Sequence, residues 1–108
     1  MTRGGDVPGK TGTPVLEPVV PEETRRSPIW RVVLHNDDVT TMDFVVHLLM
    51  TLFGMPLAEA RRLMLEVHHG GAAVVAACPR ERAELYVEQV RSLARPRGFP
   101  LVATAEPE

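Results

Sequence analysis

The distribution of proline is the feature that most limits what this chain can fold into. Residues 1–28 hold five of its ten prolines and four of its eight glycines, and they contain no phenylalanine, tyrosine or tryptophan. A segment of this composition cannot bury enough apolar surface to offset the entropy lost on ordering. We therefore expect residues 1–28 to be a flexible N-terminal extension and residues 29–106 to form one domain.

The domain is predicted to contain three strands and three helices in the order β-α-α-β-α-β. Runs of apolar and β-branched residues predict strands at residues 29–35, 72–78 and 99–104. The second run is apolar throughout and predicts a buried strand, whereas Pro100 predicts that the third lies at an edge or turns its side without ladder bonds outward. Three strands are not stable alone, so we expect an α+β, two-layer sandwich of three helices on a three-stranded antiparallel sheet.

Each predicted helix has an identifiable start. Thr40 and Asp43 have the spacing of a capping box and predict the first helix, which Gly54 ends. Pro56 and Pro79 suit the first turns of the second and third helices. The apolar residues predicted to face the core recur at spacings of three and four. They are Val45, Leu48, Leu49, Leu52 and Phe53, then Leu57, Ala60, Leu63, Met64 and Val67, and finally Ala83, Tyr86, Val87, Val90, Leu93 and Ala94.

Charge and composition argue against several classes of partner. A formal net charge of -2 and a pI near 6.1 do not suit a protein that neutralises many phosphates, so we expect no nucleic acid partner. The single cysteine cannot form an intramolecular disulfide, and the apolar runs are too short to span a bilayer. The N-terminus lacks the apolar stretch of a signal peptide. These features predict a cytoplasmic protein with no membrane partner.

Two polar clusters are the candidate sites. The first, His35-Asn36-Asp37-Asp38, lies between a predicted strand and helix, where turn and capping chemistry alone would explain it. The second, His68-His69, lies at a helix end, where the macrodipole favours histidine. A metal site is the alternative, but the chain has neither a His-x-x-x-His nor a Cys-x-x-Cys pair. We therefore expect neither a metal nor another cofactor.

A catalytic centre is not expected either. Cys78 lies in a predicted buried strand, where its thiol would have a raised pKa, and neither Ser27 nor Ser92 is part of a nucleophile motif. Methionines usually fill cores. However, Met42 and Met64 each lie close to a polar cluster, which indicates a shallow pocket with an apolar floor and a polar rim. The sequence thus favours a binding protein over an enzyme.

Three segments resemble motifs of the ClpS family. The run from Trp30 to Val45 resembles its signature, a hydrophobic strand followed by Asn-Asp-Asp-x-Thr-x-Met-acidic-Phe-Val. Met64 to Gly70 resembles its Met-x-x-Val-His segment, and Gly98 to Leu101 its closing Pro-Leu strand. The resemblance spans residues 29–106 and implies a Clp protease adaptor. Such an adaptor binds N-degrons, proteins with Leu, Phe, Tyr or Trp as first residue, and delivers them to a ClpA-type or ClpC-type unfoldase for ATP-dependent degradation.

The resemblance also implies a role for particular residues. The α-amino group of a substrate would be bound by Asn36, Asp37 and His68. The side-chain pocket would be lined by Met42, Val45, Met64, Val67 and Leu101, and the loop would be supported by Asp38 and Thr40. The unfoldase would dock near Glu81, Glu84 and Tyr86, although Tyr86 stands where well-known members have lysine, and Thr41 stands where the family often has proline.

Two other functions fit a small α/β domain of this kind. A stalk-type translation module would bind protein factors, but it leaves the Asn-Asp-Asp and Val-His motifs unexplained. A small metal-dependent hydrolase would use the histidines and aspartates as ligands, and a zinc or calcium titration would reveal it.

Overall fold

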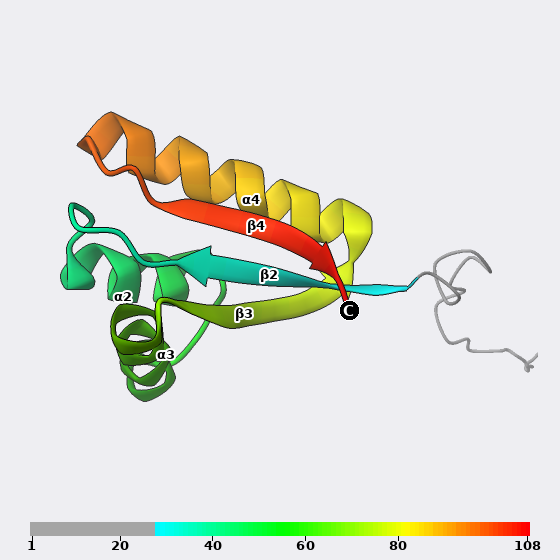
Figure 1. Cartoon of the computed structure of the whole chain (residues 1–108), viewed down its shortest axis with the longest axis horizontal. Helices are drawn as coiled ribbons and strands as arrows, with labels where there is room; N and C mark the ends of the chain where they lie inside the picture. Colours follow the sequence, from blue (N-terminus) through cyan, green and yellow to red (C-terminus); the bar gives the residue numbers. More distant parts are fainter. Residues whose placement is uncertain (1–27) are drawn as a thin grey trace, which may run out of the picture.

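The computed structural model describes residues 28–108 and confirms the predicted class and order of elements. The elements are β2 (Ile29–His35), α2 (Met42–Thr51), α3 (Leu57–Gly70), β3 (Ala72–Pro79), α4 (Arg80–Ala94), the 3-10 turn η1 (Arg95–Arg97) and β4 (Val102–Pro107), shown in Figure 1. The predicted N-terminal extension, residues 1–28, lies outside the described residues except for Pro28.

The three strands form one antiparallel sheet in the order β3-β2-β4. The prediction that the second strand is buried was wrong, because β3 is an edge strand. Ala73 and Val75 are buried, whereas Val74 between them is 44% exposed. The pairing with β2 shifts between Val32 and Val33, where a bulge leaves Val75 without a partner in the register.

All three helices lie on one face of this sheet, a point that the periodicity of the sequence left open. Val32 and Leu34 of β2 are fully buried and belong to one core cluster with residues of all three helices. Residues that alternate with them point to the other face, where the His35 ring and the Thr104 hydroxyl lie 2.8 Å apart. Leu93, predicted to face the core, is 46% exposed instead.

The helix starts differ from the prediction by one residue. Thr41, not Thr40, caps α2, because its hydroxyl accepts a hydrogen bond from the backbone N–H of Phe44 at 3.2 Å. Pro56 and Pro79 occupy the N-cap positions of α3 and α4 in extended conformation, one residue before the helical turn. The fixed φ of proline is compatible with both the N-cap and the first helical position, so the presence of proline did not show which of the two it occupies.

The last strand begins three residues later than predicted. Gly98 adopts a φ of 79° and closes the turn that follows α4. Phe99 then packs its ring against Phe44, with centroids 5.0 Å apart, and Pro100 follows it in the connection. Pairing with β2 starts only at Val102, which lies opposite His35. β4 is an edge strand as predicted, but Pro100 precedes it and is not part of it.

Candidate binding site

The sheet register brings the three motif segments to one end of the molecule. His35, the last residue of β2, lies opposite Ala72 of β3 on one side and Val102 of β4 on the other. The residues just beyond this row are Asn36, Gly71 at the end of α3, and Leu101. The backbone N–H of Asn36 donates to the Gly71 carbonyl at 2.9 Å, so the β2–α2 loop is joined to the end of α3.

Asp37 organises the loop between β2 and α2. Its Oδ1 accepts hydrogen bonds from the backbone N–H groups of Val39 at 2.8 Å and Thr40 at 2.6 Å. Its Oδ2 accepts a third from the Thr40 hydroxyl at 2.8 Å. This is the local bonding by which aspartate stabilises turns. The Thr40 hydroxyl therefore bonds to Asp37 and does not cap the helix. The capping-box spacing had predicted that it would.

The same contacts keep Asp37 ionised. Burial, the largest single influence, raises the pKa of Asp37, but it is outweighed by three other contributions. These are the hydrogen bonds from Thr40, the hydrogen bond from Val39 and the positive charge of Arg95, which together hold the pKa below its ordinary value of 3.8. A carboxylate offers about four acceptor positions, and the loop occupies three of them. Asp37 thus retains capacity for one further donor.

The apolar residues predicted to line a pocket differ in depth. Val45, Val67 and Leu101 are 6%, 2% and 1% exposed, so they belong to the core beneath the surface. Met42 is 46% exposed at the start of α2, and Met64 is partly buried on α3. The arrangement is a buried aliphatic floor with a methionine at its edge.

The polar residues predicted to bind an amine are accessible. Asn36 and His68 are both exposed, and His68 lies in the last turn of α3, three residues before Gly71, whose carbonyl the Asn36 backbone binds. The His68 and His69 rings meet edge to face with centroids 5.0 Å apart. Asp38 is exposed in the same loop. The end of the sheet therefore combines polar side chains at the surface with aliphatic ones below.

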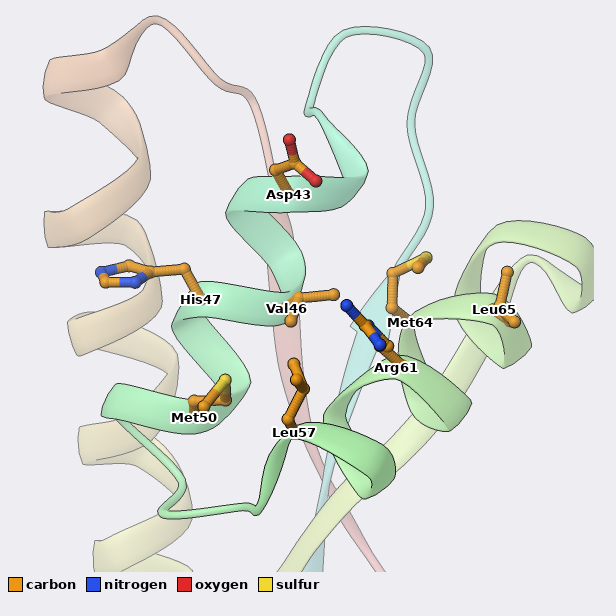
Figure 2. A pocket seen from close by; sticks show the side chains of 8 residues that line it. All are labelled: Asp43, Val46, His47, Met50, Leu57, Arg61, Met64 and Leu65. Atoms are coloured by element: carbon orange, nitrogen blue, oxygen red, sulfur yellow. The ribbon is translucent and has the colours of Figure 1, made fainter.

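A groove between α2 and α3 runs beside this region (Figure 2). It has a volume of about 400 Å³, and Met64 is the predicted pocket residue that also lines it. In Figure 2 Arg61 extends from α3 over the groove toward Val46 on α2, while His47 points away from α3. The full lining is Asp43, Val46, His47, Met50, Leu57, Arg61, Met64 and Leu65.

The residues predicted to dock an unfoldase lie near the start of α4, at the other end of the sheet. Pro79, just before α4, pairs with Ile29, whereas Ala72 pairs with His35 beside the polar site. Glu81 and Glu84 are exposed, and Glu84 accepts a hydrogen bond from Arg80 at 3.0 Å. The Tyr86 ring is partly buried against Phe53, with centroids 4.5 Å apart. Tyr86 thus contributes to packing as well as to the surface.

Three further observations concern metal ligands, membrane-spanning helices and the cysteine of residues 28–108. Within this range no group of three His, Cys, Asp or Glu side chains is placed to hold a metal ion, and no helix is long and apolar enough to cross a membrane. Burial raises the pKa of the Cys78 thiol above its ordinary value of 9.0, against the opposing charge of Arg82. The raised pKa was predicted, although Cys78 is only partly buried.

Arg95 is a residue that the sequence analysis did not single out. Its Nη1 donates to the carbonyls of Phe99 at 3.0 Å and Leu101 at 2.9 Å. A basic side chain near a helix C-terminus commonly bonds the last carbonyls of the helix, whereas Arg95 bonds carbonyls beyond the turn that follows. The spacing alone did not reveal that the second of these carbonyls belongs to Leu101, one of the predicted pocket residues.

Taken together, the polar surface, the aliphatic floor and the α+β scaffold define a small binding domain. Comparison with known proteins makes the class specific. Residues 25–104 match the model of the family described as ATP-dependent Clp protease adaptor protein ClpS. The chain therefore belongs to the ClpS family of Clp protease adaptors.

Individual relatives agree with this assignment. The ATP-dependent Clp protease adapter protein ClpS of Desulforapulum autotrophicum is 51% identical over 81 residues, covering 75% of this chain and 78% of the relative. That of Deinococcus radiodurans is 43% identical over 112 residues, covering 100% and 96%. The solved structure of Agrobacterium tumefaciens ClpS2 bound to L-phenylalaninamide aligns with a TM-score of 0.75 at 40% identity, covering 77% of this chain and all of that one.

Proposed function

We propose that this chain is a non-catalytic adaptor that binds proteins through a bulky hydrophobic first residue, Leu, Phe, Tyr or Trp, and delivers them to a Clp unfoldase. The free α-amino group is bound by Asn36, Asp37 and His68. The first side chain enters a pocket made by Met42, Val45, Met64, Val67 and Leu101. Asp38 and Thr40 support the loop.

The observation that carries this proposal is the meeting of three motif segments at one end of the sheet. Asn36 follows β2, His68 lies in the last turn before β3, and Leu101 precedes β4. Candidate acceptors and apolar residues thus come from segments that lie at the same end of the sheet, which supports one site for an amine and an apolar side chain. The ligand of the Agrobacterium tumefaciens relative, L-phenylalaninamide, combines a free amine with a bulky apolar side chain. This supports a site in which polar residues bind the amine and apolar residues bind the side chain.

The amine chemistry suits the donors and acceptors present. An α-ammonium has three N–H donors, and the acceptors offered are the Asn36 amide oxygen, the unused position on the Asp37 carboxylate and an unprotonated His68 nitrogen. Hydrogen bonds to charged groups contribute about 1.5 to 3 kcal/mol each. Acetylation of the substrate removes the charge and two of the three donors, so it is expected to abolish this part of the binding.

The apolar part contributes a similar amount. Burying a Leu or Phe side chain contributes about 1.5 to 3 kcal/mol, whereas micromolar affinity needs about 8 kcal/mol. Two or three amine hydrogen bonds contribute about 3 to 9 kcal/mol in total, so at mid-range values they fall short of that value alone and reach it together with the buried side chain. The requirement for both parts makes the site selective for a free N-terminus that carries a large apolar residue.

Delivery is assigned to the opposite end of the molecule. Glu81 and Glu84 lie in the first two turns of α4, and the start of this helix is about 20 Å along the seven-residue β2 from the end of the sheet that carries the proposed amine site. A partner bound there leaves the peptide site uncovered. We assign this surface, with Tyr86 at its border, to a ClpA-type or ClpC-type unfoldase in the cytoplasm, and residues 1–28 to an extension that the unfoldase engages during delivery.

The test is fluorescence anisotropy with labelled peptides that differ only in residue one. Peptides beginning with Leu or Phe should bind with micromolar or better affinity, whereas peptides beginning with Ala or acetyl-Leu should bind at least about tenfold more weakly. Equal affinity for all of these peptides would refute the proposal. It would favour the alternative of a stalk-type module that binds other protein factors.

A further inference from the structure

Arg95 ties together the backbone that leads into β4. Its Nη1 carries two hydrogens and lies 3.0 Å from the Phe99 carbonyl and 2.9 Å from the Leu101 carbonyl, one donor for each. These two carbonyls flank Pro100, which has no N–H of its own. The segment lies outside β4, so the sheet ladder does not hold it.

The position of this segment matters because Leu101 is the floor of the proposed pocket. Its side chain is 1% exposed, yet its backbone follows a glycine turn and a proline and precedes the first strand residue, Val102. The Phe99 N–H is held by the Ala94 carbonyl at 3.1 Å, so the N-terminal side of the segment is anchored to α4. Arg95 supplies the second anchor, on the side nearest the pocket.

Arg95 also influences Asp37, which lies on the amine-binding side of the proposed site. Its positive charge is one of the contributions that lower the pKa of Asp37. In Figure 1 the end of α4, the connection to β4 and the β2–α2 loop all lie at the same end of the molecule. One guanidinium therefore bonds the backbone of the apolar floor and favours the charged form of the amine-binding carboxylate.

We propose that Arg95 is a positioning residue of this site, which clamps the Phe99 and Leu101 carbonyls and so fixes where the Leu101 side chain closes the pocket. This inference rests on the proposed function. It predicts that Arg95 influences how strongly the site selects a large first side chain, although Arg95 is not among the residues assigned to line the pocket. A residue important only for folding would not change that selectivity.

The experiment compares full-length wild type with Arg95→Met and the control Arg91→Met. Arg91 lies one turn earlier on α4, where its guanidinium donates to the exposed Glu88 at 3.3 Å. Competing peptides that begin with Leu or Ala are titrated against a labelled Leu peptide. Arg95→Met should weaken binding of the Leu peptide about tenfold, as expected for loss of charge-assisted hydrogen bonds. It should also lower the ratio of Leu to Ala affinity, and Arg91→Met should change neither.

Arg95→Lys covers the case in which Arg95→Met fails to fold, as judged by its thermal unfolding. Lysine keeps the charge near Asp37, but its ammonium is a flexible point charge whose donors are not held in fixed directions as those of a guanidinium are. A Leu-to-Ala ratio below that of wild type is therefore expected for Arg95→Lys as well. An unchanged ratio in a folded Arg95 variant overturns the role of Arg95 alone, whereas a wild-type chain that does not prefer Leu over Ala overturns the proposed function itself.

Discussion

Replacing Thr40 by valine tests how the β2–α2 loop is held. The change keeps the shape of the side chain and removes the hydroxyl that donates to Asp37 Oδ2 at 2.8 Å. A fully formed hydrogen bond to a charged group is worth about 1.5 to 3 kcal/mol, and partial access of water to both residues reduces this, so we expect a loss of about 1 kcal/mol. For a domain of this size that corresponds to a fall of about 4 to 8 °C in Tm.

The loss should depend on pH in a defined direction. The folded state lowers the pKa of Asp37 below 3.8, so the ionised carboxylate contributes stability that is present above this value and is lost as pH falls through the lowered pKa. The difference between wild type and Thr40→Val should thus be full at pH 7 and shrink below about pH 4. In the variant, the pKa of Asp37 should rise, because one of its donors is gone.

Thermal unfolding at pH 7, 5 and 3.5, together with NMR titration of the Asp37 carboxyl carbon, measures both effects. Thr51→Val is the matched control, since the Thr51 hydroxyl donates to the uncharged His47 carbonyl at 2.9 Å in an exposed place. The control should show no change in its effect between pH 5 and 3.5. Equal Tm values for wild type and Thr40→Val at pH 7, or an unshifted Asp37 titration, would refute the reasoning.

Three further predictions follow from the same structure. Met42→Ala, which trims the half-exposed pocket edge, should admit peptides that begin with the β-branched residues Ile and Val, and continued rejection in an anisotropy assay would argue against a rim role. Deleting residues 2–24 should leave peptide binding unchanged and slow unfoldase-dependent degradation, so undiminished degradation would contradict delivery through the extension. Leu34→Ala, at a fully buried position, should lower the free energy of unfolding by about 2 to 5 kcal/mol in urea, and a loss below 1 kcal/mol would place Leu34 outside the core.

The order of elements could be predicted because each depends on short-range patterns. The strand at residues 29–35 has the bounds predicted for it, since β-branched residues end there at a turn-forming Asn-Asp-Asp run. The helices also follow from apolar spacing, and Gly71 caps α3 as predicted. By contrast, α2 ends at Thr51 with Leu52 as its C-cap, before the predicted stop at Gly54. The residue that caps a helix was predicted wrongly where neighbouring residues have the same capping ability. Both Thr40 and Thr41 can cap a helix. Because the Thr40 hydroxyl donates to Asp37, the Thr41 hydroxyl caps α2 instead.

The errors in the strands have a tertiary cause. The apolar run at residues 72–78 has the composition of a buried strand, but β2 takes the centre of the sheet and leaves β3 at an edge. Phe99 also has strand propensity, but its ring packs on Phe44 and the pairing of Val102 with His35 sets the strand start. Which strands are neighbours depends on contacts between residues distant in sequence, and local propensity does not encode them.

For the proposed site, short sequence motifs identify the chemical groups: acceptors at Asn36, Asp37 and His68, and aliphatic residues that include Leu101. The tertiary structure brings the segments that carry these groups to the same end of the sheet. The antiparallel register aligns the end of β2 with the starts of β3 and β4, and Arg95 then bonds the Leu101 carbonyl. The segments that carry residues 36, 68 and 101 come together only when strand pairing closes the long stretches of chain between them, and a pattern within one segment carries no information about that closure.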